Sequence, residues 1–348
     1  IRDSVNGLVG SEMCIRDRAE IVLGIGCTHT PQLHTPAELW DVRAKRDRED
    51  GVPFWYRGRR LQYADVEDER RSEDLGAQTA LDIREDRLRK AHAAIDRVAG
   101  ILGDVDPDAV VIFGNDQDEM FLDDVKPAFT IMGAPRFENM PRSPEQVERL
   151  PPGIALADTG HLPDQAVELP GHPDLAEHIA ASCSGAGFDV AYSRRQVRAD
   201  AARAQTAGMP HAYGFVYKQL MRERPIPNVP VDTNTLYPPN QPTAGRCLAF
   251  GEAVGNAIRA WEEPLRVAVI ASGGLSHFVV DEAFDREIMT AMASNDFERL
   301  TEYSESYFQA GSSEIKSWIA AGGAMRNSGL AGEIVEYQPL YRTPAGTG

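Results

Sequence analysis

The sequence predicts a single α/β domain in which helices cover both faces of a mostly parallel central sheet. Short apolar runs rich in β-branched residues alternate along the chain with longer segments of helical apolar spacing, as in a parallel sheet with crossover helices. No Pro/Gly/Ser-rich linker, shift in composition or internal repeat divides the chain after its first residues. A chain of 348 residues can bury a sizeable core as one domain.

The predicted strands are short apolar runs bounded by turn residues. The first is 20–26 (EIVLGIG), and the second is 109–113 (AVVIF), which leads into a polar loop. The clearest is 265–271 (LRVAVIA), whose continuous apolar character is typical of a buried strand. Further strands are predicted at 129–132, 188–192 and 228–234.

Helical spacing predicts helices over 76–102 and 244–261. Another begins at Pro173, because proline suits the first helical position and Asp174 favours the helix dipole, and it ends near Gly185. The chain after 271 is mostly helical in this prediction, with an extended piece at 333–341. The remaining two stretches are predicted to be less regular: a charged and aromatic one at 35–75, forming helical turns and loop over an opening, and a proline-rich one at 134–173.

The composition excludes several classes of partner. Acidic residues outnumber basic ones by 53 to 36, for a formal charge of −17, so nucleic acids and anionic membranes would be repelled. No apolar run approaches the roughly 18 residues of a membrane helix. The four cysteines have no paired spacing, which argues against a disulfide framework or a zinc ribbon. We therefore expect a soluble, cytoplasmic protein with neither a nucleic-acid nor a membrane partner.

Residues 1–18 stand apart from the rest. They contain the tripeptide IRD twice and show neither helical nor strand periodicity, and they lack the continuous apolar stretch of a signal peptide. The string MCIRDR resembles a translated sequencing adapter. We interpret 1–18 as a non-native leader, with a natural disordered tail as the alternative, and 19–348 as the folded domain.

Unusual polar residues follow three of the predicted strands. His29 comes directly after the first strand, Gln117 lies in the loop after the second, and His277 follows the strand at 265–271. Carboxyl ends of parallel strands meet at one edge of a sheet, so these side chains can converge. A histidine placed there can bind a transition metal or transfer a proton, although a structural role is the alternative for each. Dinucleotide, P-loop, G-x-S-x-G and HExxH motifs are absent from the sequence.

Together these motifs resemble the class III extradiol ring-cleavage dioxygenases, the superfamily of the protocatechuate 4,5-dioxygenase catalytic subunit. The pattern is most similar to single-chain 3-O-methylgallate and gallate dioxygenase-like members. The family's fold is an α/β sheet with helices on both faces. The matching stretches are EIVLGIGCTHTPQL (20–33), VVIFGNDQDEMF (110–121), LPGHPDLAEHIA (169–180), PHAYGFVY (210–217), VPVDTNTLYPPNQPTAGRCLAFGEAV (229–254), VAVIASGGLSHFVVDEAFD (267–285) and SSEIKSWIAAGGA (312–324).

The resemblance implies roles for particular residues. His29, in an H-x-P motif, corresponds to the family's first iron-binding histidine. Glu314, four residues before Trp318, corresponds to its iron-binding carboxylate. His277 corresponds to the acid/base histidine, and His211 to a further active-site histidine.

At Gln117 the chain departs from the pattern. In the protocatechuate enzyme the second iron-binding histidine follows an N-D pair, whereas here glutamine follows Asn115 and Asp116. Gln117 could bind iron through its amide oxygen, more weakly than imidazole, or Asp116 or another histidine could replace it. The third ligand therefore stays open.

The implied activity is that of a non-haem Fe(II)-dependent extradiol dioxygenase. It would insert both atoms of O2 to open the ring of a catecholic aromatic acid of the 3-O-methylgallate, gallate or protocatechuate type, in lignin-derived aromatic catabolism. Tyr213, Asn234 and Tyr237 are candidates for the substrate pocket, with packing as the alternative. A homodimer is expected from the family. The competing hypotheses are a non-catalytic metal- or ligand-binding homologue and a metal-dependent hydrolase on the same fold.

Overall fold

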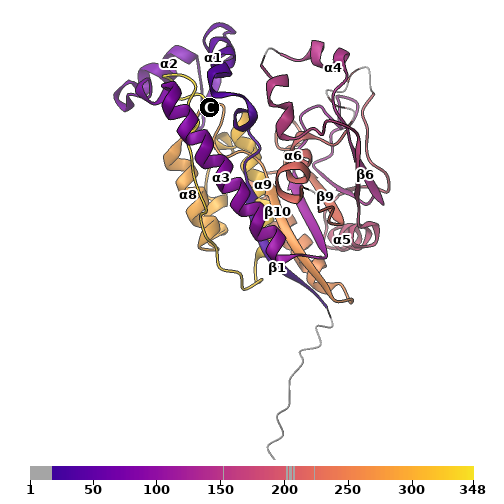
Figure 1. The fold of residues 1–348 in the computed structure, drawn as a ribbon. Coiled ribbons are helices and arrows are strands. Elements are labelled where there is room, and N and C mark those ends of the chain that lie inside the picture. Colours follow the sequence, from indigo (N-terminus) through magenta and orange to yellow (C-terminus); the bar gives the residue numbers. More distant parts are fainter. Residues whose placement is uncertain (1–17, 152, 201–202, 204–205, 207, 223) are drawn as a thin grey trace, which may run out of the picture.

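A computed structural model describes residues 18–151, 153–200, 203, 206, 208–222 and 224–348. Apart from Arg18, the expected leader lies outside the described residues. The described chain forms a six-stranded central sheet with helices on both faces (Figure 1), in the strand order β1-β10-β4-β9-β5-β8. The predicted α/β class is therefore confirmed.

The sheet is mostly parallel. β1 (Ala19–Cys27), β10 (Leu265–Ser272), β4 (Ala109–Gly114) and β9 (Asn228–Thr233) run in one direction. β5 (Phe129–Met132) pairs with β9 antiparallel, and β8 (Ala191–Ser193) follows β5 in parallel. The carboxyl ends of β1, β10, β4 and β9 therefore lie at one edge of the sheet, as the sequence predicts.

The strand at 188–192 was predicted wrongly in its extent. Pairing begins only at Ala191, and Phe188 and Val190 pack against the hydrophobic core ahead of the paired segment.

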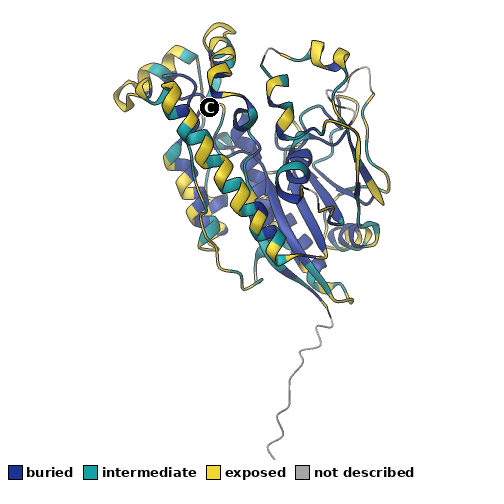
Figure 2. Cartoon of the chain, viewed as in Figure 1, coloured by how far each residue is buried: buried dark blue, intermediate teal, exposed yellow. Residues whose placement is uncertain are grey.

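Alternate residues of the buried strands face different helical layers. Val111 and Val269 pack with the layer of α5 (Pro173–Gly185), α7 (Ala244–Ala260) and α9 (Ile315–Met325). Ile112 and Ile270 pack on the other face, with α3 (Leu81–Val105), α6 (His211–Phe215) and the π-helical turn η6 (Val216–Met221). Figure 2 shows the result, with buried strands between helices that are exposed on their outer sides.

The two stretches predicted to be less regular hold short elements. The first contains the helix α1 (Trp40–Glu49), the hairpin of β2 (Phe54–Tyr56) and β3 (Arg59–Leu61), and α2 (Tyr63–Glu69). The second contains an antiparallel pair, β6 (Arg136–Asn139) with β7 (Val167–Pro170), and the helix α4 (Pro144–Arg149). The helices α1 and α2 agree with the helical turns expected over 35–75. The two strand pairs and α4 were not predicted, because elements of three to six residues leave almost no periodic signal.

The chain after β10 is largely helical, as predicted, with α8 (Glu282–Ala293) preceding α9. The segment 333–341 forms no strand. It leads to a buried terminal segment, 340–348, that bridges at Thr347 to Val279, two residues after His277. Within the described part of the chain, no helix combines the length and the apolar character needed to cross a membrane.

Candidate metal centre

His29 follows β1 and is buried, 6% exposed. Its Nδ1 lies 3.0 Å from the hydroxyl of Ser272 at the end of the neighbouring strand β10. That hydroxyl donates its only proton to the carbonyl oxygen of Ala212, 2.7 Å away, so it must accept from His29 Nδ1–H. Burial lowers the pKa of His29, which keeps the imidazole neutral. Its Nε2 therefore carries a lone pair.

Glu314 is the last residue of a 3₁₀ turn, η9 (Ala310–Glu314), directly before α9. Its carboxylate is 1% exposed, and its Oε2 lies 3.0 Å from His29 Nε2. The backbone N–H of Gly274 donates to the same oxygen (2.6 Å). Burial alone would raise the pKa of Glu314, but His29 and His277 hold it well below its ordinary value, so the carboxylate is ionised.

His211 opens α6, with its side chain beside His29 at 4.5 Å between ring centroids. Glu119, from the loop after β4, accepts a hydrogen bond from His211 Nδ1 (2.7 Å) and another from the His211 backbone N–H (3.0 Å). Burial opposes the charge on this imidazole, yet Glu119 raises the pKa of His211 above its ordinary value. The hydrogen bond to Glu119 occupies Nδ1 of His211, so Nε2 is the ring nitrogen that it can offer to a metal.

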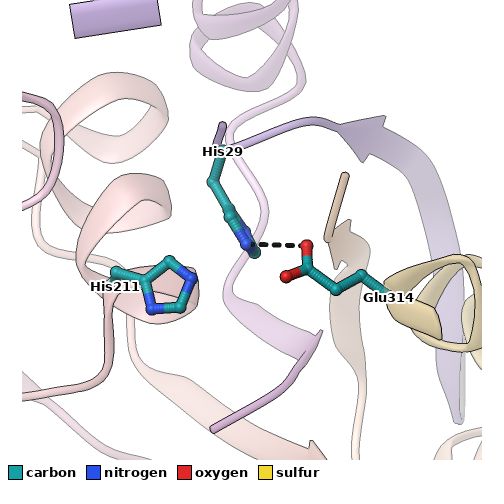
Figure 3. A group of neighbouring side chains, drawn as sticks. All are labelled: His29, His211 and Glu314. Carbon is teal, nitrogen blue, oxygen red and sulfur yellow. Dashed lines mark ion pairs between the residues drawn. The ribbon is translucent and has the colours of Figure 1, made fainter. Parts of the chain in front are cut away.

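His29, His211 and Glu314 come from three separate segments and point toward one another (Figure 3). Each offers a ligand atom, and the three atoms lie within 4.8 Å of one another. Among the described residues His29 Nε2 has no hydrogen-bond partner, and in the states derived above this atom and Glu314 Oε2, 3.0 Å apart, can both offer a lone pair to a cation. Two imidazoles and a carboxylate are the donor set typical of non-haem Fe(II) sites, and the residues therefore fit such an ion.

His277 lies next to this cluster. Its Nε2 is 3.7 Å from Glu314 Oε1, and its Nδ1 is 2.8 Å from the carbonyl oxygen of Leu275, which must accept the Nδ1 proton. Burial lowers the pKa of His277, but the Glu314 carboxylate more than offsets this and raises it. The imidazole can thus hold a proton or release it at Nε2.

Gln117 also lies beside Glu314, and its Nε2 donates a hydrogen bond to Glu314 Oε1 (2.6 Å). Its neighbour Asp116 turns inward, where its carboxylate accepts from the backbone N–H groups of Glu119, Met120 and Phe121. Burial raises the pKa of Asp116 to about 7. Asp116 therefore shapes the loop.

The three residues considered for the substrate pocket make other contacts. The buried Tyr213 hydroxyl donates to Asp232 (3.2 Å), and Asn234 closes a turn through two 2.9 Å hydrogen bonds with the backbone of Tyr237. The ring of Tyr237 lies under the Lys126 ammonium group, 3.6 Å from its centroid. Within the described part of the chain, none of these contacts joins Tyr213, Asn234 or Tyr237 to His29, His211 or Glu314.

Sequence reasoning missed Glu119 and Ser272, which hold the two cluster histidines. Both lie in polar strand-end segments that the sequence marks out, but their pairing with distant histidines has no local signal. A further histidine near the cluster is His161, whose side chain is 13% exposed and whose ring centroid lies 6.0 Å from that of His211.

Three relatives share sequence with this chain. It is 28% identical to gallate dioxygenase of Pseudomonas putida over 207 residues, which is 56% of each protein. It is 25% identical over 292 residues to a 2,3-dihydroxyphenylpropionate/2,3-dihydroxicinnamic acid 1,2-dioxygenase of a Rhodococcus species, covering 68% of this chain and 82% of the relative. The enzyme of that name from Cupriavidus necator is 34% identical over 190 residues, 53% of this chain and 47% of its own length. The chain thus spans about half the length of the first and third relatives.

A family model describes the catalytic LigB subunit of aromatic ring-opening dioxygenase, and it matches residues 82–347. The match includes His211, His277 and Glu314, whereas His29 precedes it. Since it covers about three-quarters of the chain, this protein belongs to the LigB family of class III extradiol dioxygenases.

Proposed function

We propose that this protein is a non-haem Fe(II)-dependent extradiol dioxygenase that opens the ring of a catechol. One observation carries the proposal: the lone pair of His29 Nε2 faces the ionised Glu314 Oε2 at 3.0 Å, an arrangement of two acceptors that suits a cation. The family supplies the reaction class.

His29, His211 and Glu314 would hold the iron. Bound there, Fe(II) would supply a common site for the vicinal hydroxyls of the substrate and for O2. We assign the third ligand to His211 rather than Gln117, because the Gln117 amide nitrogen is turned toward Glu314 and an amide oxygen binds iron more weakly than imidazole. In this assignment Gln117 steadies the Glu314 carboxylate.

His277 would act as the general base and then as the general acid of the reaction. Its Nε2 faces the cluster at 3.7 Å from Glu314 Oε1, while its Nδ1 is held by a backbone carbonyl, so proton exchange is confined to the nitrogen that faces the substrate. It would accept a proton from a catechol hydroxyl and return one to the ring-opened product.

The substrate type, the domain bounds, the oligomeric state and the location complete the proposal. The resemblance supports an aromatic substrate of the gallate, 3-O-methylgallate or protocatechuate type in lignin-derived catabolism, and two relatives are named for gallate and for 2,3-dihydroxyphenylpropionate or 2,3-dihydroxicinnamic acid. A catalytic domain over 19–348, a homodimer and a cytoplasmic location are the accompanying proposals.

The test is oxygen uptake by protein that has been loaded with Fe(II) under anaerobic conditions. We expect uptake with catechols, one O2 per ring opened, in wild type and in His172→Ala, whose side chain caps α5 away from the cluster. His277→Ala should bind iron but lose at least 99% of activity. His29→Ala should lose iron itself, measured by metal analysis after gel filtration.

Other results would contradict the proposal. Tight iron binding without O2 consumption on any catechol would favour the ligand-binding or hydrolase alternatives. Absence of iron binding would remove the metal centre altogether.

A further inference from the structure

A cavity of about 500 Å³ runs along β1, the edge strand of the sheet, and reaches His277, although none of the three cluster residues lines it. At its near end lie Thr28 and Thr30, on either side of His29, together with His277. Trp318, one helical turn after Glu314, also lines it and donates its indole N–H to the carbonyl oxygen of Gly273 (2.8 Å). The segments that carry the cluster therefore also form the wall of this cavity.

Away from the cluster the walls are mostly apolar. They come from β1, from the inner face of α3, from the end of α8, from α9 and from the segment 330–340 that closes the cavity. The small Gly26 leaves space for the Trp318 ring, which a Cβ at that position would overlap. Representative lining residues are Leu23, Ile25, Ala94, Ile95, Val98 and Met292.

The charge of the lining selects against an anion. No lysine or arginine is among the described residues that form it, whereas Asp285, Glu333 and Glu336 are. At the rim, Arg97 is paired with Glu333 (2.7 Å) and Arg87 donates to the carbonyl oxygen of Pro339 (2.9 Å). A carboxylate entering the cavity would lose its hydration without gaining a cation, which is costly.

We propose that this cavity receives a neutral, apolar substituent of the catechol ring. The substrate is then an alkyl- or aryl-substituted catechol, and this departs from the catecholic acids that the resemblance implies. The inference rests on the proposed function, because it places the ring between the metal cluster and His277. A dry cavity of about 150 Å³ holds a benzene molecule, so this one admits a chain of several carbons or a second ring.

The first experiment compares kcat/KM among catechol, 3- and 4-butylcatechol, and 3-(2,3-dihydroxyphenyl)propionate, using the Fe(II)-loaded full chain. Each buried methylene should improve kcat/KM by about two- to fourfold, so one butylcatechol isomer should exceed catechol at least tenfold. The propionate should show no gain over catechol. An equal or better value for the propionate than for both butylcatechols would overturn the inference.

Two variants of α3 make a matched pair. Ala94 lines the cavity, whereas its neighbour Ala93 is exposed. Ala94→Phe should reduce kcat/KM for the preferred butylcatechol at least fivefold and that for catechol less than twofold, while Ala93→Phe should change neither. An equal loss on both substrates in Ala94→Phe would show that the cavity is not a substituent site.

Leu330→Lys is the second variant, should Ala94→Phe fail to fold. Leu330 lies in the irregular closing segment, and a lysine there would supply the missing cation. We expect the ratio of kcat/KM for propionate over butylcatechol to rise at least tenfold. An unchanged ratio would contradict the proposal.

A binding titration separates the inference from the proposed function. Wild-type protein should bind n-butylbenzene by calorimetry, and Ala94→Phe should not. If no catechol is consumed, the proposed function fails and this titration alone decides whether the cavity takes an apolar group. If catechols are consumed without any advantage of the butyl group, the inference fails and the proposed function stands.

Discussion

His29 and His211 each have Nδ1 engaged by a buried acceptor, which leaves Nε2 as the nitrogen that can bind a metal. The two acceptors differ. Ser272 is neutral and passes its own proton to a backbone carbonyl, whereas Glu119 is a carboxylate that adds negative charge behind the ring. Such partners behind a metal-binding imidazole fix its orientation and raise its basicity. At the scale of single residues, the centre therefore depends on side chains that do not themselves bind the metal.

Glu119→Gln should weaken Fe(II) binding about 10- to 100-fold, because the amide removes the negative charge behind His211 and holds its ring less firmly. Competition with a coloured chelator under anaerobic conditions measures the affinity. Glu148→Gln, at an exposed position of α4, is the control and should match wild type. An unchanged affinity in Glu119→Gln would argue against His211 as a ligand.

Asp285 provides a pH-dependent contribution to stability. Burial raises its pKa from 3.8 to about 6, so the folded state binds this proton more tightly than the unfolded state. Stability from this group is thus present below about pH 4 and is lost as pH rises to 6.

Asp285→Asn imitates the protonated form. The free energy of unfolding of the wild type, relative to this variant, should fall by about 2–3 kcal/mol between pH 4 and pH 8. Urea denaturation across that range measures the difference. The exposed Asp164→Asn should run parallel to wild type, and a parallel profile for Asp285→Asn as well would refute the assignment.

At the scale of elements, the contact between α7 and α9 sets the position of Glu314. The two helices approach closely because glycines face the partner backbone. A Cβ at Gly251 would overlap the carbonyl oxygen of Ala320, and one at Gly323 would overlap that of Leu248. Since α9 begins directly after Glu314, this spacing places the carboxylate at the end of β10.

Gly251→Ala should lower the free energy of unfolding by about 1–3 kcal/mol, because the methyl group forces the two helices apart. Iron affinity should fall in parallel. Gly245→Ala, in the exposed first turn of the same helix with nothing within 4 Å, should be neutral or slightly stabilising. Chemical denaturation of the three proteins makes the comparison, and equal stability of both variants would show that the close approach is unimportant.

At the scale of the whole molecule, the terminal segment 340–348 connects α1 with the two loops that follow β1 and β10. The Arg342 guanidinium, 1% exposed, binds Asp47 of α1 (Nε–Oδ2 2.7 Å) and Gln32, three residues after His29 (2.7 Å). The same segment pairs with the chain after His277, where the Val280 N–H donates to the carbonyl oxygen of Gly346 (2.9 Å). One buried ion pair thus supports both histidine-bearing loops.

Arg342→Met should destabilise the protein by about 3–5 kcal/mol, because Asp47 is left without its cation. The double variant Arg342→Met/Asp47→Leu should recover part of that loss, as a double-mutant cycle in urea would show. Arg194→Met removes an exposed pair with Glu177 and should cost less than about 1 kcal/mol. A loss in Arg342→Met no larger than in this control would contradict the role given to the pair.

The sequence by itself determined the α/β class, the long helices, the buried strands and the placement of His29, Gln117 and His277 after strand ends. It could do so because helical periodicity, apolar strand runs and turn residues are local properties of the chain. The resemblance added Glu314 and His211, which local patterns do not distinguish from ordinary polar residues.

Only the tertiary structure decided how these side chains combine. It placed His211 beside His29 and Glu314 with a ring nitrogen to offer, it turned the amide nitrogen of Gln117 toward Glu314, and it revealed Glu119 and Ser272 behind the two imidazoles. It also enclosed the apolar cavity between β1, α3 and the closing segment 330–340. Each of these features joins parts of the chain that are far apart in sequence, so it is set by packing and not by any local pattern.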